Sequence, residues 1–117
     1  AVTDRTAALD LDLIARLREA LRGAGKADAG VSGVDVPLVL HGSSGVPDDA
    51  IAAAVRAGMT KINVSTHLNG FFTRAIRETL EADPRLVDSR KYLAPARDAV
   101  AGEAARLLRL FAGQDAA

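Results

Sequence analysis

The amino-acid sequence predicts an α/β fold in which two parallel strands and their flanking helices form part of a larger sheet or barrel. Two short apolar runs, residues 36–40 and 60–64, alternate with segments of helical periodicity. Each run leads through a short connection into a helix, as in the βα units of parallel sheets. Such runs are typical of strands buried on both faces, and a lone pair has two unpaired outer edges. We therefore expect the neighbouring strands to come from elsewhere.

The first predicted element is an amphipathic helix over residues 10–23. Asp10 is a candidate N-cap and Gly23 a candidate end. Apolar residues recur at helical spacing between charged ones: Leu13, Ile14, Leu17 and Leu21. The segment 23–35 contains four glycines and no apolar period, which is typical of a flexible, exposed connection.

The predicted strand at 36–40 ends at His41 and leads into a second helix. Pro47 suits the first helical turn, and the two acids after it suit the positive end of the helix dipole. We expect Gly58 to end this helix. Its expected inward side chains are Ile51, Ala54 and Val55.

The strand at 60–64 precedes a helix that starts at about His67 and ends at Pro84. Its apolar stripe consists of Leu68, Phe71, Phe72, Ala75, Ile76, Thr79 and Leu80. Residues 88–94 are predicted to be a linker, and Pro95 to open the last helix. The apolar repeat of that helix consists of Val100, Ala104, Leu107, Leu108 and Phe111.

Length and composition limit the possible functions. The 117 residues, 49% apolar and 26% charged, are typical of one globular domain, 1–117, and are too few for a (β/α)8 barrel of roughly 250 residues. Fifteen basic and fifteen acidic side chains balance, which argues against nucleic acid or an anionic membrane as a partner. The absence of cysteine excludes disulfides and thiolate sites, which leaves the two histidines, His41 and His67, and the carboxylates as possible metal ligands.

Neither a signal peptide nor a run of about eighteen apolar residues stands in the sequence. We therefore expect a cytoplasmic protein. Residues 114–117 are expected to be a frayed tail.

Polar residues follow both predicted strands. The segment His41-Gly42-Ser43-Ser44-Gly45 lies between a strand end and a helix start, where backbone N–H groups, hydroxyls and close approach at glycine favour a phosphate. A turn in which Ser44 caps the helix also explains the segment. A histidine at a strand end is more often structural than a ligand.

The segment Asn63-Val64-Ser65-Thr66 has the same position after the second strand. Alternation sends Asn63 and Ser65 to one side of the chain and Val64 and Thr66 to the other. A buried Asn63 would need a partner, either a neighbouring backbone group or a ligand hydroxyl. Two adjacent loops rich in phosphate donors match the phosphate site that the last two loops of (β/α)8 barrels form.

Several separated segments resemble the carboxyl-terminal part of class II, metal-dependent fructose-bisphosphate and tagatose-bisphosphate aldolases. They are residues 38–49 (LVLHGSSGVPDD), 58–66 (GMTKINVST) and 88–97 (DSRKYLAPAR). Residues 3–21 resemble the loop and helix before the seventh strand of that family. The resemblance implies that the chain is the C-terminal part of a (β/α)8 TIM barrel, with two parallel strands and flanking helices, and is incomplete as a barrel.

The resemblance also implies roles for single residues. His41 matches one of three histidines that hold the catalytic Zn²⁺, which polarises the ketose carbonyl and stabilises the enediolate of dihydroxyacetone phosphate. The implied substrate-binding residues come from two loops: Gly42, Ser43 and Ser44, then Asn63, Val64, Ser65 and Thr66. In the second loop Asn63 is near the reacting carbon, and Ser65 and Thr66 contact the phosphate. The implied reaction is reversible aldol cleavage of a ketose 1,6-bisphosphate to dihydroxyacetone phosphate and glyceraldehyde 3-phosphate.

The sequence departs from the family in three places. His67 stands where the family usually has Asp or Glu, and we favour a solvent-facing position over an extra metal ligand. The stretch from Gly23 to Gly33 resembles an insertion. A catalytic zinc needs about three protein ligands, but the family's other two histidines and its acid/base Asp belong to earlier strands, one histidine just upstream of Ala1. We therefore expect no catalytic residue in this chain.

The leading hypothesis is a class II ketose-bisphosphate aldolase that uses zinc, of which this chain carries one ligand and the phosphate loops. Its partners would be a sugar bisphosphate and either a second copy or a complementary barrel segment, and the isolated chain should have negligible activity. The alternative is a truncated or split, non-catalytic fragment that binds phosphate or oligomerises. A free-standing two-strand domain with an unrelated phosphate ligand would make the joint match a coincidence. The choice between fructose and tagatose depends partly on loops outside this chain.

Overall fold

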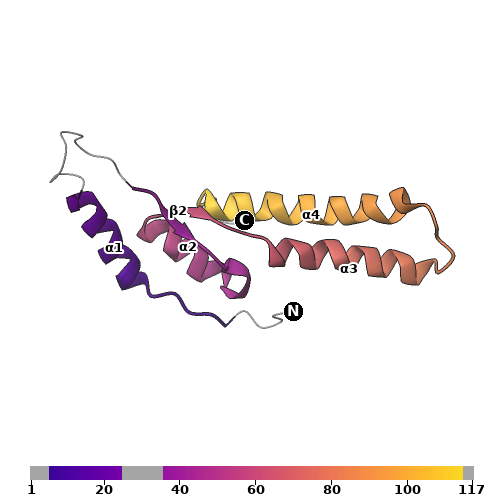
Figure 1. The fold of residues 1–117 in the computed structure, drawn as a ribbon, viewed down its shortest axis with the longest axis horizontal. Coiled ribbons are helices and arrows are strands. Elements are labelled where there is room, and N and C mark those ends of the chain that lie inside the picture. Colours follow the sequence, from indigo (N-terminus) through magenta and orange to yellow (C-terminus); the bar gives the residue numbers. More distant parts are fainter. Residues whose placement is uncertain (1–5, 25–35, 115–117) are drawn as a thin grey trace. The chain divides into compact units, whose positions relative to one another are not determined.

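Two parallel strands and four α-helices follow one another in a computed structural model that describes residues 6–24 and 36–114 (Figure 1). The order is α1 (Leu11–Ala24), β1 (Leu38–Leu40), a 3₁₀ turn (Ser43–Gly45), α2 (Asp48–Ala57), β2 (Met59–Ile62), α3 (Thr66–Ala82) and α4 (Ser89–Phe111). The chain divides into two compact units, Val2–Asn63 and Val64–Ala117. The α/β fold with two parallel strands is confirmed. Most of the predicted glycine-rich connection, residues 25–35, and residues 115–117 of the predicted tail lie outside the described part.

The start of α1 follows the capping signal in the sequence. The Asp10 carboxylate Oδ1 accepts a hydrogen bond from the Leu13 amide at 2.8 Å, which satisfies one of the free N–H groups of the first turn. The helix runs one residue past Gly23. Ile14 is buried, but Leu13 and Leu17 remain over 40% exposed, so only part of the predicted apolar stripe is covered.

The sheet is a parallel pair in which Leu38 lies opposite Met59 and Leu40 opposite Ile62. Both strands are shorter than the predicted runs, and β1 begins after Pro37, which has no N–H to donate to a ladder. The strands are not covered on both faces by the described residues: Leu40 is the one buried strand residue, and Val39 is 37% exposed. A two-stranded sheet that packs against α2 has no second layer of its own within residues 6–24 and 36–63.

Helix α2 carries the centre of the core in the first unit. Ile51 and Ala54 are almost fully buried, as predicted, and Val55 is half-buried. Pro47 is the N-cap rather than a residue of the first turn. Gly58 ends the helix with a φ of 120°, and a Cβ there would lie 2.3 Å from Cδ of Arg18. The backbone angle favours glycine at this position, and a larger residue would also displace the flexible Arg18 side chain.

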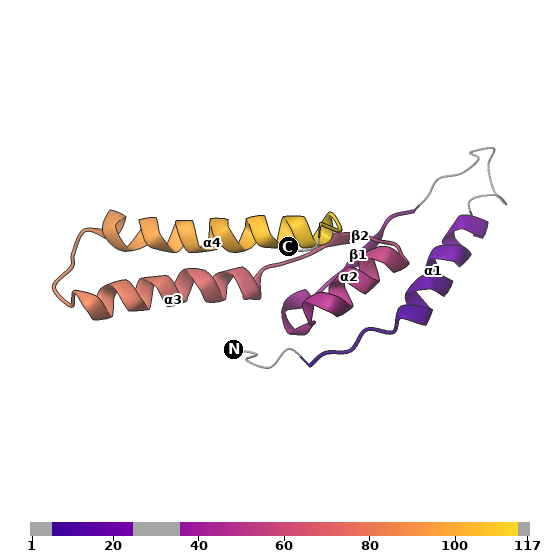
Figure 2. The ribbon, with the colours of Figure 1, turned by 180° about the vertical axis from the view of Figure 1, so that it is seen from behind.

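The second unit is a hairpin in which α3 and α4 lie side by side (Figures 1 and 2). All seven residues of the predicted α3 stripe are half-buried, because a single partner helix covers one side of the stripe. Asp83 is the residue after the helix, so Pro84 follows its end as expected. On α4, Leu107 is buried but Leu108 is 67% exposed, which places Leu108 outside the apolar face.

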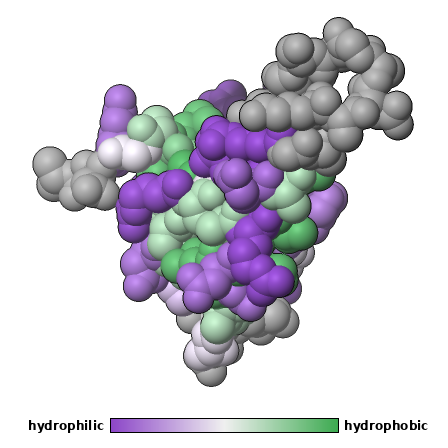
Figure 3. Space-filling view, turned by 90° about the vertical axis from the view of Figure 1, so that its left-hand side faces the viewer, coloured by the Kyte–Doolittle hydropathy of each residue, from purple (hydrophilic) through white to green (hydrophobic). Residues whose placement is uncertain are grey.

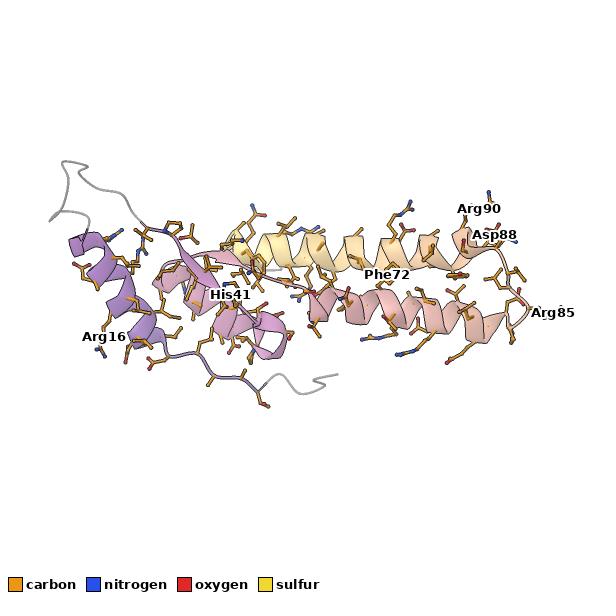
Figure 4. The ribbon with its side chains drawn as sticks, viewed as in Figure 1. Arg16, His41, Phe72, Arg85, Asp88 and Arg90 are labelled. Atoms are coloured by element: carbon orange, nitrogen blue, oxygen red, sulfur yellow. The ribbon has the colours of Figure 1, made fainter. Side chains whose placement is uncertain are left out.

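The predicted linker at 88–94 is wrong, because α4 begins at Ser89 and contains Pro95 in its interior. Asp88 is the N-cap, and its Oδ1 accepts from the Arg90 amide at 3.1 Å. The Arg90 guanidinium also pairs with Asp88 (Figure 4). Proline costs an interior helix about 3 kcal/mol, so the cap and the packing against α3 must offset that cost.

Apolar side chains remain on the surface of the described residues, and Figure 3 shows hydrophobic surface interspersed with hydrophilic surface. None of the helices in the described ranges combines the length and apolarity that crossing a bilayer requires.

Candidate functional site

The first candidate loop leaves β1 through an exposed histidine and a left-handed glycine. His41 directly follows Leu40 at the end of the strand (Figure 4). Gly42 has a φ of 68° and ψ of 37°, a conformation that favours glycine. The 3₁₀ turn Ser43–Gly45 follows and closes with a hydrogen bond from the Val46 amide to the Ser43 carbonyl at 3.1 Å. The chain therefore reverses sharply at the carboxyl end of the strand.

Asn63, directly after β2, ties this loop to the second strand through three hydrogen bonds. Its amide donates to the Leu40 carbonyl at 3.0 Å, and its carbonyl accepts from Ser43 Oγ at 2.8 Å. Its side-chain Nδ2 lies 3.0 Å from Nδ1 of His41. The predicted need of Asn63 for a partner is thus met by the His41 ring, which is neither of the two partners we expected. We call Asn63, Ser43 and His41 the Asn63 cluster.

The Asn63 cluster orients the ring of His41 through the contact between Asn63 Nδ2 and His41 Nδ1. With the Asn63 amide in this orientation its nitrogen donates and Nδ1 of His41 accepts, which corresponds to the tautomer with the proton on Nε2. A metal bound at Nε2 would need the proton on Nδ1 and the Asn63 amide turned round. The residues that the structure describes include no group of three or more His, Cys, Asp or Glu side chains able to hold a metal. The donor set of this part of the chain therefore does not fit a zinc site by itself.

The two serines of the loop have different environments. Ser43 is 4% exposed and its hydroxyl is committed to Asn63. Ser44 is half-buried, and within residues 6–24 and 36–114 its hydroxyl has no hydrogen-bond partner. The alternative in which Ser44 caps α2 is wrong, because Pro47 is the N-cap and no side chain caps it. Of the two serines, Ser44 is therefore the one whose hydroxyl is left for an anion.

The amino end of α2 is a poor anion site. Its first turn carries Asp48 and Asp49, and Asp49 Oδ1 accepts from the Ala50 amide at 2.9 Å. These carboxylates already compensate the positive end of the helix dipole. An anion at this loop is therefore better served by the turn Ser43–Gly45 than by the helix.

The rest of the second candidate loop, residues 64–66, belongs to the helical unit. Val64 is half-buried and leads to Ser65, the N-cap of α3, which makes no side-chain cap hydrogen bond. Ser65 and Thr66 are exposed, and the first turn of α3 has no acidic residue. The first-turn amides of α3 and the hydroxyls of Ser65 and Thr66 are thus accessible to an anion. The first turn of α2 differs, because it carries two acidic residues.

His67 does not face solvent as we expected, because it forms a hydrogen bond to a buried carboxylate on α4. His67 Nε2 lies 2.6 Å from Glu103 Oε1, and the side chains are 19% and 7% exposed. Arg106 donates to the same carboxylate through Nε at 2.9 Å and Nη2 at 2.7 Å. The Arg106 guanidinium and, more weakly, His67 lower the pKa of Glu103. The ring of His67 also meets Phe71 edge-on at 5.2 Å.

Sequence reasoning missed Glu103, although a signal was present. Glu103 stands three residues after Val100 and four before Leu107, so it occupies a position in the apolar stripe of α4. A charged residue on a buried helix face needs a partner from the neighbouring helix or its own. Here the partners are His67 and Arg106.

Comparisons with known proteins agree with the loop motifs. The sequence model of the family described as fructose-bisphosphate aldolase class-II matches residues 1–116. A fructose-bisphosphate aldolase of Geobacillus stearothermophilus is 43% identical over 76 residues, which are 65% of this chain and 26% of the relative. A probable fructose-bisphosphate aldolase of Bacillus subtilis is 48% identical over 65 residues, 56% of this chain and 23% of the relative. The chain thus spans about a quarter of the length of these relatives.

Proposed function

This chain belongs to the class II fructose-bisphosphate aldolase family, and from that premise we propose that it supplies the phosphate-binding loops of an aldolase. The reaction is reversible cleavage of the C3–C4 bond of fructose 1,6-bisphosphate, or of its tagatose epimer, to dihydroxyacetone phosphate and glyceraldehyde 3-phosphate. The phosphate of the dihydroxyacetone half would contact Gly42, Ser44 and the amides of the 3₁₀ turn, with Ser65 and Thr66 as donors from the second loop.

The observation that carries this proposal is the Asn63 cluster. The amide, carbonyl and side chain of Asn63 hold the ends of both strands and the His41 ring together. A bound phosphate gains most from donors that are fixed before it arrives. The buried hydroxyl of Ser43 fixes the loop through its hydrogen bond to Asn63. The hydroxyl of Ser44 is left to bind the phosphate.

Zinc is proposed as the cofactor of the complete site, with His41 as one ligand. Because the described residues do not fit a zinc site alone, the other ligands and the acid/base carboxylate must come from another segment. The (β/α)8 barrel is likewise a proposal for the complete protein. The uncovered sheet supports it, because in a closed barrel further strands pair with the edges of β1 and β2, and the barrel interior and its outer helices cover the two faces.

An activity assay tests the proposal. We expect the 117-residue chain, with zinc and fructose 1,6-bisphosphate, to show negligible turnover, and to gain it when a segment that supplies the missing ligands is added. The control is the same mixture with His41→Ala, which should stay inactive. Chelator-sensitive turnover by the chain alone would contradict the proposal.

The second candidate is a non-catalytic fragment that binds phosphate or associates through its strand edges. The described residues include no group of three or more metal-ligating side chains, and Val39 of β1 is exposed; both observations favour this candidate. Phosphate-dependent amide shifts at Ser44 without activity in any complemented mixture would support this candidate over the first.

A further inference from the structure

The buried carboxylate of Glu103 links the two helices of the hairpin at one point. The pair of Arg106 with Glu103 lies within α4, three residues apart, so it fixes the carboxylate without reaching α3. The hydrogen bond that crosses to α3 is the one from His67 Nε2. We call His67, Glu103 and Arg106 the α3 anchor. It meets α3 in its first turn, one residue after Thr66.

We infer that Glu103 is a positioning residue that acts through His67 to hold Ser65 and Thr66 in the geometry that binds the substrate phosphate; this inference rests on the proposed function. This positioning does not require Ser65 or Thr66 to contact Glu103. The carboxylate fixes the backbone of the turn from which their donors project.

The first turn of α3 needs such a tether because its local capping is weak. Ser65 makes no side-chain cap hydrogen bond, and the turn has no acidic residue to favour the helix dipole. The Asn69 amide donates to the Ser65 carbonyl at 3.0 Å, but helix ends that lack caps fray. A tether one residue into the helix opposes fraying without occupying the amides that an anion would use.

The buried charge of Glu103 restrains the first turn of α3 against movement away from α4. A carboxylate that is 7% exposed must keep its hydrogen-bond donors, because an unpaired buried charge is costly. Arg106 supplies two donors from α4, and His67 supplies the third. Movement of the first turn away from α4 would leave the Oε1 atom with one donor fewer, so the buried charge resists that movement.

Two variants of His67 separate this role from simple packing. His67→Ala removes both the N–H donor and the ring against Phe71, whereas His67→Gln removes the ring but keeps an amide N–H near the position of Nε2. Asp88→Asn is the matched control, because it neutralises a carboxylate of the same unit at the start of α4, where Asp88 pairs with Arg90.

The measurements use the 117-residue chain and nuclear magnetic resonance. Amide hydrogen exchange at Asn69 reports opening of the first turn, and titration with inorganic phosphate reports binding through the shifts of the Ser65 and Thr66 amides. For His67→Ala we expect exchange about tenfold faster and phosphate binding at least threefold weaker. For His67→Gln and Asp88→Asn we expect both values to stay within about twofold of the unaltered chain.

The exchange rates and the phosphate titration together test whether the α3 anchor positions the phosphate-binding turn. If His67→Gln behaves like His67→Ala, the ring packing and not the hydrogen bond holds the turn, and the inference is overturned. Faster exchange with unchanged phosphate binding overturns it as well, because the anchor is then structural only. Absence of phosphate shifts in the unaltered chain refutes the proposed function of this loop instead, and the exchange rates still decide whether the anchor orders the turn.

Discussion

Replacement of Ser43 by alanine removes the hydroxyl that donates to the Asn63 carbonyl at 2.8 Å from a side chain that is 4% exposed. A hydrogen bond contributes a net 1 kcal/mol or so, and an acceptor left without its donor costs more, so we expect a loss of about 1–2 kcal/mol. That loss corresponds to a factor of about 5–30 in an opening equilibrium. Hydrogen exchange of the Asn63 amide, which is bonded to the Leu40 carbonyl, should therefore accelerate by this factor.

Ser44→Ala is the control, because it removes the same atom from the next residue. Its hydroxyl has no partner among the described residues, so exchange at Asn63 should change less than twofold. Phosphate binding should instead weaken by a factor of about 10–150, since hydrogen bonds to charged groups contribute about 1.5–3 kcal/mol. If exchange of the Asn63 amide accelerates equally in both variants, or does not accelerate in Ser43→Ala, the assignment of a structural role to Ser43 and a binding role to Ser44 is refuted.

The remaining predictions concern the strained glycine, the buried carboxylate and the metal. Gly58→Ala should lower the free energy of unfolding, measured in urea, by about 1–3 kcal/mol. In an Arg18→Ala background the cost of Gly58→Ala should be smaller, because the side chain that the new Cβ would meet is gone. An equal cost with and without the Arg18 side chain would contradict a steric contribution from it. The pKa of Glu103 is lower in the folded chain than its ordinary 4.5, so the unfolded chain binds protons more readily and the stabilisation is lost as pH falls below that value. Circular dichroism should show this acid dependence, and Glu103→Gln should reduce it. In equilibrium dialysis the chain should retain no stoichiometric zinc; retention that His41→Ala abolishes would show a complete site.

Several features follow from short stretches of sequence. The cap at Asp10, the end of α2 at Gly58 and the order of strands and helices each depend on residues within a few positions. Pro95 misled the prediction, because proline favours the first turn of a helix and the competing signal, the cap at Asp88, lies seven residues earlier.

The sequence by itself determined the family, the two loops and the residue types available for phosphate, because these are carried by contiguous motifs. Only the tertiary structure decided which of those groups are free. Ser43 and His41 are joined to Asn63 across 20 and 22 residues, and His67 to Glu103 across 36. Such hydrogen bonds depend on how separate elements pack, and periodicity along one element does not encode them. Packing therefore commits Ser43 and His67 to internal bonds and leaves Ser44 accessible.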